Sequence, residues 1–335
     1  MTLGLVVGKF YPPHRGHKLL IDTARRQVDR LVVLLPAHPS QAIPGALRRQ
    51  WLEEIHPDCE IHLVPDELDN DSRQWADFTL AHLGRAPDVV FSSEDYGPHY
   101  ASFMGARHVM VDIARAQVPC SATGIRAAPL EHFHFLEPCV RAYYVRRVVL
   151  IGAESTGKTT LAAALAAKYQ TAWVPEYGRQ YWEKKVAGLH MHGPLPGWTD
   201  EEFLHIACEQ QRRENRAARA ANKVLLCDTN AFATGMWYER YMGRRHPDVD
   251  AVGARDTAHL YLLALPDFPF VQDGFRDGEK IRGWMHERFV AAVAHTGVPW
   301  VSLGGTHETR LAQAAHAIDA LISTSPRGLA SGHHG

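Results

Sequence analysis

The stretch VVLIGAESTGKTT, residues 148–160, decides the fold of the second half of this chain. It opens with four apolar residues, typical of a buried strand, and continues into the spacing GxxxxGKT from Gly152 to Thr159. The helix-forming run LAAALAAK follows at 161–168. A strand, a glycine-rich turn and a helix in this order form a loop whose backbone amides cradle phosphates. A merely flexible glycine loop is the alternative, and the three features together argue against it.

The residues of this loop are expected to share the contacts with ATP. We expect Lys158 to reach the β- and γ-phosphates and the Thr159 hydroxyl to ligate Mg²⁺. Asp228 ends the apolar run VLLCD, where a Walker B carboxylate would hold the metal through water. A helix N-cap role for Asp228 is the alternative, although Thr229 or Asn230 can cap instead. The other predicted phosphate-binding residues of the loop are Gly152, Glu154, Ser155, Thr156, Gly157 and Thr160.

Two later segments of this half carry polar residues that fit a kinase. The segment PEYGR, 175–179, follows the second strand and faces the loop where a phosphate acceptor binds. We expect Glu176 to orient a hydroxyl, with Tyr177 and Arg179 beside the acceptor. The segment DGFRD, 273–277, together with Arg282 resembles the lid of small-molecule kinases, with Arg276 and Arg282 near ATP. A solvated charge run is the alternative for both arginines.

The rest of the chain repeats one alternation of strands and helices. Short β-branched runs alternate with helical stretches from Leu3 onward, and the pattern restarts near residue 146. At 335 residues the chain exceeds the size of most single cores. We predict two doubly wound parallel-sheet α/β domains, residues 1–146 and 147–324, and a disordered tail at 325–335. Thr199 and Glu202 form a capping-box pattern that opens a long polar helix toward Ala221, interpreted as a lid or surface element.

The first domain carries a second phosphate-binding pattern directly after its opening strand. Residues 8–17 read GKFYPPHRGH and place His14 and His17 three residues apart where a helix should begin. Such a turn aims backbone donors and the positive helix end at one point. Both imidazoles can then donate to phosphate oxygens, while Gly16 leaves room for the nucleotide. A metal pair or an incidental solvated turn is the alternative.

This pattern resembles that of the HIGH-type nucleotidyltransferase superfamily, in which HxGH holds the phosphates of ATP on a Rossmann-like sheet. The segment CSATGIR, 120–126, looks like the later ISxTxxR motif of that superfamily. The resemblance places Ser121 and Thr123 at a helix start and implies that the guanidinium of Arg126 binds a phosphate group through two N–H donors. Cys120 departs from the apolar residue that is usual there. Gly8 and Phe10 complete the expected ATP-binding set of this domain.

The chemistry implied by this resemblance needs no covalent nucleophile. A phosphate oxygen of the acceptor attacks the α-phosphorus of ATP and expels pyrophosphate. Catalysis would come from alignment of the two phosphates and from charge neutralisation by His17, Lys9, Arg126 and Mg²⁺. His14 would position the triphosphate.

The two patterns together, with PEYGR and DGFRD, resemble the NadR family over nearly the whole chain. That resemblance implies a kinase that converts nicotinamide riboside to NMN and an adenylyltransferase that converts NMN and ATP to NAD. It also suggests that Arg48, Arg49 and Trp51 hold NMN, with core packing as the alternative for Trp51. Many members carry an N-terminal helix-turn-helix, whereas here the first strand begins by Leu3. We therefore expect no repressor role, because the sequence shows no helix-turn-helix that would bind DNA.

Other classes of function stay open at this point. A fusion of phosphopantetheine adenylyltransferase and dephospho-CoA kinase shares both ATP motifs, although PEYGR and the long helix favour the nicotinamide alternative. Near-neutral charge, 36 Lys plus Arg against 37 Asp plus Glu, counts against a nucleic-acid-binding regulator. A nucleotide sensor with one inactive domain is a third alternative. We expect no DNA partner and no membrane span, and we leave a homo-oligomer open.

The cysteine and histidine usage fits a cytoplasmic protein without a structural metal. The five cysteines contain no CxxC pair, as in reduced cytosolic proteins. Most of the 21 histidines lack a metal-ligand rhythm. The expected ligands are therefore small molecules: ATP with Mg²⁺ at both sites, nicotinamide riboside, NMN and NAD.

Overall fold

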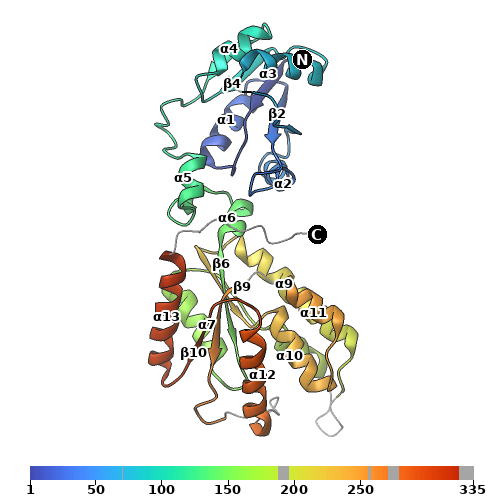
Figure 1. Ribbon diagram of the computed structural model, residues 1–335, viewed down its shortest axis with the longest axis vertical. Helices are drawn as coiled ribbons and strands as arrows, with labels where there is room; N and C mark the ends of the chain where they lie inside the picture. The colour runs from blue at the N-terminus through green and yellow to red at the C-terminus, as the bar shows by residue number, and fades with distance from the viewer. Residues whose placement is uncertain (70, 188–195, 256–257, 271–278, 324–335) are drawn as a thin grey trace. The chain divides into compact units, whose positions relative to one another are not determined.

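The computed structural model describes residues 1–69, 71–187, 196–255, 258–270 and 279–323. The chain divides into two compact units, the first ending at Tyr143 and the second beginning at Tyr144. Each unit contains one five-stranded sheet in which every strand pairing is parallel. Helices flank both sheets (Figure 1), so the predicted fold class of two doubly wound α/β domains is confirmed.

The sheet of the first unit has the strand order β3-β2-β1-β4-β5. Its strands are β1 (Leu3–Val7), β2 (Arg30–Ala37), β3 (Glu60–Pro65), β4 (Val89–Ser92) and β5 (Arg107–Met110). The order of the strands reverses between β1 and β4, and ligands of doubly wound sheets bind at the carboxyl ends of the strands at such a switch point. The HxGH segment follows β1, so this topology places it at the switch point.

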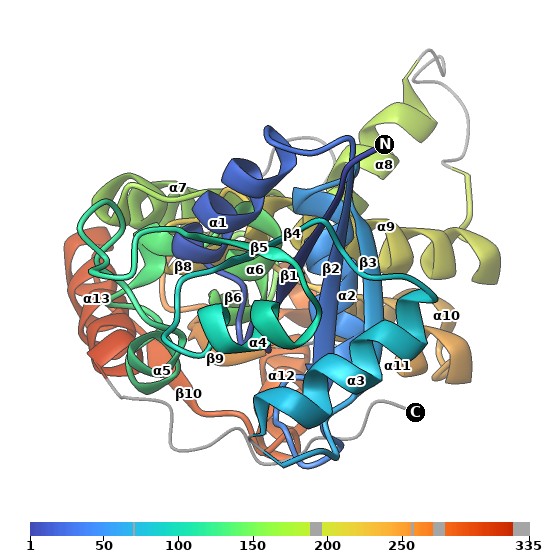
Figure 2. The ribbon, with the colours of Figure 1, turned by 90° about the horizontal axis from the view of Figure 1, so that it is seen from above.

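Helices cover both faces of this sheet. They are α1 (Arg15–Arg25), α2 (Gly45–Ile55), α3 (Ser72–Leu83), α4 (Gly97–Phe103), α5 (Ala122–Ala127), the 3-10 turn η1 (Phe133–Phe135) and α6 (Pro138–Tyr144). Side chains alternate along each strand: Val6 packs in the core beneath α1 and α2, while Leu5 packs in the core beneath α3 and α4. Figure 2 shows α1 on one side of β1 and β2, with α3 and α4 on the other.

The sheet of the second unit has the order β10-β9-β6-β8-β7. Its strands are β6 (Arg146–Ile151), β7 (Trp173–Val174), β8 (Val224–Asp228), β9 (Ala258–Ala264) and β10 (Trp300–Leu303). The glycine-rich loop follows β6, the central strand, and Asp228 ends the neighbouring strand β8. Parallel pairing of Leu150 with Asp228 brings the loop and this carboxylate to the same edge of the sheet.

The helices of the second unit separate into two layers. They are α7 (Lys158–Tyr169), α8 (Tyr177–Val186), α9 (Asp200–Ala218), α10 (Ala231–Met242), α11 (Pro247–Ala254), the 3-10 turn η2 (Glu279–Ile281), α12 (Arg282–Ala294) and α13 (His307–Ser323). Leu161 of α7 and Ile318 of α13 share one core with Val148 and Leu150. In Figure 1 these two helices lie on one side of the sheet, and α9, α10 and α11 lie on the other.

The long helix α9 differs from the lid or surface element that its polar sequence suggested. The predicted capping box is present, because Thr199 and Glu202 exchange side-chain and backbone hydrogen bonds. The helix then buries Phe203, Ile206, Ala207, Gln210 and Glu214 against its neighbours. Within the described residues, no helix combines the length and the apolar character needed to cross a membrane. The expected lid segment 273–277 and the tail 325–335 lie outside the described residues.

Candidate active sites

The HxGH turn of the first unit is organised by His14. Its side chain caps α1, with Nδ1 accepting from the backbone N–H groups of Gly16 at 3.1 Å and His17 at 3.4 Å. The His14 and His17 rings stack with centroids 3.7 Å apart, and Phe10 meets His17 edge-on at 4.9 Å. A Cβ atom on Gly16 would lie 3.0 Å from the His14 ring, so this position favours glycine. Phe10 is buried beneath the turn and supports His17.

Both imidazoles are held in the neutral form. Burial lowers the pKa of His14 to about 4, with a further contribution from the Arg115 guanidinium. Burial lowers the pKa of His17 well below its usual range, helped by the charges of His14 and Arg115. Because Nδ1 of His14 is occupied as an acceptor, its proton resides on Nε2, which can donate to an anion. No sequence motif pointed to Arg115, which lies in the loop between β5 and α5.

The second motif meets the first through Arg126. Ser121 caps α5 by accepting from the Gly124 N–H at 3.1 Å. Arg126 donates to the Tyr11 carbonyl and, at 3.1 Å, to the Thr123 hydroxyl, and its guanidinium lies 4.6 Å from the centre of the Tyr11 ring. The structure therefore brings Arg126 to the HxGH segment from a position 115 residues away in the chain. The described contacts of Ser121 and Thr123 are within their own helix turn.

Four further candidates of the first unit lie in different environments. Gly8 is the first residue after β1, and its N–H donates to the Leu34 carbonyl at 3.1 Å. Lys9 is exposed and forms a 2.6 Å ion pair with Asp66. Arg49 pairs instead with Glu53 on the exposed face of α2, at 2.7 Å. Trp51 is buried and meets Tyr143 edge-on, which is the packing alternative that the sequence left open.

Arg48 differs from the substrate-binding role expected for it. Its side chain is completely buried and donates to the carbonyl of Lys9 and to the side-chain oxygen of Gln41. An arginine with 0% exposure has no open face toward a dissolved ligand. The contacts of Arg48 instead fix the backbone of the phosphate-binding segment.

The glycine-rich loop of the second unit has the backbone that its glycines predict. Gly152 has φ 138° and a Cβ there would lie 2.7 Å from the Ala264 carbonyl oxygen, while Gly157 has φ 76°. Lys158 Nζ donates to the carbonyls of Gly152 at 3.0 Å and Ala153 at 2.8 Å. The ammonium group therefore lies over the loop whose amides would bind phosphates.

Thr159 and Asp228 meet as a metal-binding pair would. The Thr159 hydroxyl donates to Asp228 Oδ2 at 2.5 Å. Asp228 Oδ1 is buried and has no hydrogen-bond partner among the described residues. Burial raises the pKa of Asp228, opposed by the charge of Lys158. Asn230 caps α10, so the cap role considered for Asp228 belongs to Asn230. A hydroxyl beside an uncompensated carboxylate oxygen fits Mg²⁺ held through water.

Glu176 lies within the electrostatic reach of the loop. Burial raises its pKa, and the Asp228 carboxylate raises it further, whereas Lys158 and Arg179 act in the opposite direction. Arg179 lines the same cavity and pairs with Glu183 at 2.9 Å. Tyr177 differs from its expected place beside the acceptor, because its ring packs under Arg213 and its hydroxyl meets His205 at 3.0 Å.

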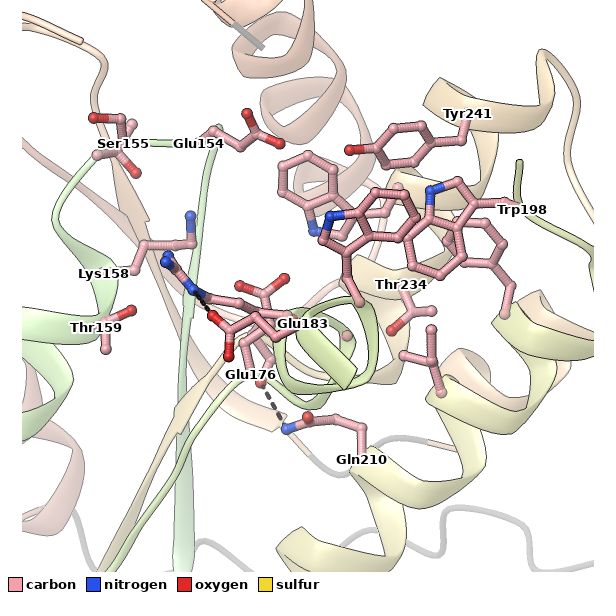
Figure 3. A pocket seen from close by; sticks show the side chains of 18 of the residues that line it. Glu154, Ser155, Lys158, Thr159, Glu176, Glu183, Trp198, Gln210, Thr234 and Tyr241 are labelled. Carbon is pink, nitrogen blue, oxygen red and sulfur yellow. Dashed lines mark hydrogen bonds and ion pairs between the residues drawn. The ribbon is translucent and has the colours of Figure 1, made fainter. Parts of the chain in front are cut away.

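A cavity of about 480 Å³ extends from the loop to a cluster of aromatic side chains (Figure 3). The Trp182 and Trp198 rings stack with their centroids 4.9 Å apart, and the centroids of the Trp198 and Tyr241 rings are 5.7 Å apart. Trp237 also lines the cavity. Carboxylates are present at the loop end, where Glu154 forms a 2.6 Å ion pair with Arg240. Sequence reasoning missed this aromatic cluster, because its members come from three separate segments and follow no common motif.

A second cavity of about 540 Å³ lies on the other side of the loop. Its lining includes Ser155, Thr156, Gly157 and Thr160 from the loop and helix, together with Phe268 and Arg310. Arg310 donates to Thr156 O at 3.0 Å and lies 4.7 Å from the centre of the Phe268 ring. Arg282 donates to the carbonyls of Ser155 and Phe268, so this predicted residue does reach the loop. Arg276 lies outside the described residues.

The geometry of the two units defines a class of protein. An HxGH turn at the switch point of a parallel sheet is typical of nucleotidyltransferases, and a P-loop facing an aspartate at the end of the next strand is typical of ATP-binding kinases. The cytidylyltransferase-like family model matches residues 5–128, and an AAA domain model matches residues 147–310. The chain is therefore a bifunctional enzyme with a nucleotidyltransferase unit and an ATP-binding kinase unit.

Comparison with curated proteins narrows this class to one family. The chain is 30% identical over 300 residues to the trifunctional NAD biosynthesis/regulator protein NadR of Escherichia coli K12, covering 82% of this chain and 72% of that protein. The NadR protein of Salmonella typhimurium LT2 is 29% identical over 298 residues with the same coverage. The chain belongs to the NadR family. Membership sets aside the CoA-pathway alternative.

Solved structures agree with the fold. A crystal structure of a NadR protein in complex with NR superimposes with a TM-score of 0.78 at 22% identity, covering 98% of both chains. A second NadR structure, in complex with NAD and AMP-PNP, gives a TM-score of 0.73 at 19% identity with the same coverage. The likeness therefore covers the sequence of both units.

Proposed function

We propose that this enzyme makes NAD in two ATP-dependent steps. The second unit phosphorylates nicotinamide riboside to NMN, and the first unit transfers the adenylyl group of ATP to NMN, releasing pyrophosphate. Family membership supports the pathway, since the relatives are named as NAD biosynthesis proteins. The observation that carries the substrate assignment is the aromatic cavity that opens from the P-loop.

The cavity suits a flat cationic base. The pyridinium ring of nicotinamide riboside carries a positive charge, and aromatic faces attract cations held within about 6 Å. Trp182, Trp198 and Tyr241 line the cavity, and their rings already attract cations, since Lys185 lies 5.1 Å from the centre of the Trp198 ring and Arg240 lies 4.5 Å from that of Tyr241. The cavity carboxylates Glu154 and Glu183 are paired with Arg240 and Arg179. We assign the ring to the aromatic end and the ribose 5′-hydroxyl to the loop end, where Glu176 lies. The base of ATP would occupy the second cavity, against Phe268.

The kinase step is a displacement at the γ-phosphorus. The 5′-hydroxyl oxygen forms a bond to phosphorus, the bond to the β-γ bridging oxygen breaks, and ADP leaves. Glu176 accepts the hydroxyl proton in this proposal, because burial holds its pKa above that of an ordinary carboxyl group. Lys158 neutralises charge on the phosphates. Thr159 and Asp228 would hold Mg²⁺, which supplies further charge neutralisation when bound.

The adenylyl transfer step uses the first unit. A phosphate oxygen of NMN attacks the α-phosphorus of ATP, and the bond to the bridging oxygen of pyrophosphate breaks. The neutral imidazoles of His14 and His17 donate hydrogen bonds to the triphosphate, while Lys9 and Arg126 provide positive charge. We place these reactions in the cytoplasm, where the five free cysteines stay reduced.

The test is a product assay with purified full-length protein. We expect ATP, Mg²⁺ and nicotinamide riboside to give NMN and then NAD on one chromatogram, and phosphopantetheine to give no product. Chelation of Mg²⁺ should stop both steps. Turnover of phosphopantetheine without turnover of nicotinamide riboside would contradict the proposal.

Two tryptophan variants test the cavity itself. Trp198→Ala should raise the KM for nicotinamide riboside on the order of tenfold or more, since it removes an aromatic face worth about 1–2 kcal/mol. Trp284→Ala is the matched control, because this exposed tryptophan of α12 does not belong to the described lining of the cavity. Equal KM values in the two variants would remove Trp198 from the acceptor site.

A further inference from the structure

A buried polar chain connects α9 to the turn that carries Glu176. Tyr177, the first residue of α8, has a backbone N–H without a partner inside its own helix. Gln210 Oε1 accepts that N–H at 2.9 Å. Gln210 Nε2 donates to Glu214 Oε1 at 2.9 Å, one turn further along α9. The backbone at the start of α8, and with it that of Glu176, is therefore hydrogen-bonded to α9 through Gln210.

The donor-to-acceptor order of these hydrogen bonds is fixed because Gln210 and Glu214 are both buried and must find their partners within the protein. Gln210 is 2% exposed and Glu214 is 0% exposed. A carboxylate only accepts hydrogen bonds, so the Gln210 amide group faces Glu214 and its carbonyl oxygen must face Tyr177. Arg147 of β6 lies 3.9 Å from Glu214 and donates to Asn215 at 2.7 Å, which holds the far end of the chain. If the side-chain amide of Gln210 were flipped, its NH₂ group would face the N–H of Tyr177, and two donors would meet.

Two further contacts clamp the same turn onto α9. The Arg213 guanidinium lies 4.1 Å from the centre of the Tyr177 ring, and the Tyr177 hydroxyl meets His205 at 3.0 Å. Gln210 also lines the cavity together with Glu176. Figure 3 shows Gln210 projecting from its helix toward the side of the pocket on which Glu176 lies. The contacts with Arg213 and His205 fix the side chain of Tyr177, whereas Gln210 accepts its N–H among the described residues.

We propose that Gln210 is a positioning residue for phosphorylation: it fixes the start of α8 so that Glu176 faces the acceptor hydroxyl and the P-loop. This inference rests on the proposed role of Glu176 in the kinase step. In this proposal Gln210 acts through the backbone N–H of Tyr177, and ATP binding at the P-loop does not depend on it. Its loss should therefore reduce kcat and leave the KM for ATP unchanged.

The first experiment compares neighbouring glutamines on α9 in the full-length protein. Gln210→Leu keeps a side chain of similar volume and removes both the acceptor and the donor, so we expect the kinase kcat to fall on the order of tenfold. Gln211→Leu is the matched control, since Gln211 donates only a 3.4 Å bond to Val252 O among its described contacts. Adenylyl transfer to added NMN should be unchanged in both variants. Equal kinase kcat values for the two variants would overturn the proposal.

A swap of the two groups separates positioning from folding. Gln210→Glu alone places two carboxylates side by side and should lower kcat. Gln210→Glu with Glu214→Gln restores an acceptor facing Tyr177 and a donor–acceptor pair within α9, so kcat should recover. A double variant that folds, by circular dichroism and thermal melting, yet stays as slow as Gln210→Glu would contradict the proposal.

A double-mutant cycle with Glu176→Gln distinguishes this inference from the proposed function. If Gln210 acts through Glu176, then Gln210→Leu should cause little further loss in the Glu176→Gln background. Additive losses would show that Gln210 acts by another route and would overturn the inference alone. An unchanged kcat in Glu176→Gln itself would instead remove Glu176 from the proposed kinase step.

Discussion

At the scale of single residues, each phosphate site depends on charged and polar groups from its own unit. Lys158 lies over the P-loop carbonyls of Gly152 and Ala153. His17 stacks on His14 at the start of α1. Since no residue is shared between the two sets, the two reactions should respond to separate substitutions.

The first prediction is that Lys158→Ala and His17→Ala each strongly slow one reaction and spare the other. Lys158→Ala removes a charge-assisted contact to the transferred phosphoryl group, so the kinase kcat should fall on the order of a hundredfold or more. His17→Ala should lower NAD formation from NMN by a similar order, while NMN made from nicotinamide riboside accumulates. Both are measured by chromatography of the products.

The control for this prediction is folding. Circular dichroism and thermal melting should match the unsubstituted protein, because a collapsed unit would mimic a lost contact. Loss of both reactions in folded Lys158→Ala protein would mean that a single ATP site serves the two steps.

A second residue-scale prediction concerns stability at acidic pH. Burial lowers the pKa of His56 to about 4, while Asp22 opposes this shift. A histidine with a lowered folded-state pKa binds fewer protons than the unfolded chain, so its contribution is complete above pH 6.5 and is lost as the pH falls toward 4. The loss is about 3 kcal/mol in the free energy of unfolding. His56→Gln should flatten this decline.

Urea unfolding followed at pH 7.5, 6, 5 and 4.5 checks this, with His99→Gln as the comparison because His99 lies on the exposed face of α4. Identical slopes for His56→Gln and unsubstituted protein would show that His56 is protonated freely in the folded state.

At the scale of elements, α9 is the connecting helix of the kinase unit. Its N-terminus is closed by a capping box, in which the Thr199 hydroxyl accepts from Glu202 N–H at 3.3 Å and Glu202 Oε2 accepts from Thr199 N–H at 3.0 Å. Its middle binds the start of α8, and its buried face packs on α10 and α11. A substitution at the cap should therefore lower the free energy of unfolding of the second unit and have little effect on the kinase reaction.

The third prediction is that Thr199→Ala destabilises the second unit by about 1 kcal/mol, the usual contribution of a capping side chain. Thr199→Ser keeps the hydroxyl and should lose only a few tenths of a kcal/mol. Chemical denaturation, followed by the fluorescence of the tryptophans around the cavity, measures both. Equal destabilisation by the two substitutions would show that the methyl group, and not the cap, contributes the stability.

At the scale of the whole molecule, the chain consists of two units that each contain one five-stranded sheet and one of the two candidate sites. The core of the first unit is formed by side chains such as Phe91 and Tyr100, and that of the second by Leu150 and Phe289. Units with their own hydrophobic cores usually fold alone.

The fourth prediction is that residues 1–146, expressed separately, fold and form NAD from NMN and ATP. The expected result is a cooperative thermal transition and a KM for NMN within a few-fold of that of the full chain. A fragment that stays insoluble, or that is active only when residues 147–335 are added, would show that each unit needs the other to fold.

The sequence by itself determined the sites whose chemistry is local. The P-loop and the HxGH turn are contiguous segments in which the strand, the turn and the helix cap are all specified within about a dozen residues. The alternation of short apolar runs with helical stretches was enough for the fold class, because parallel strands require helical crossovers. The family resemblance was carried by the same segments.

Tertiary structure alone decided which distant side chains share a site and which are packing. The aromatic cavity gathers Trp182, Trp198 and Tyr241 from separate segments, and such a gathering has no periodicity along the chain. Arg48 and Tyr177 carry polar groups that suggested binding, yet both form hydrogen bonds to other residues of their own unit. Burial and hydrogen-bond partners are properties of the packed molecule, so residue type and spacing could not distinguish a ligand contact from a structural one.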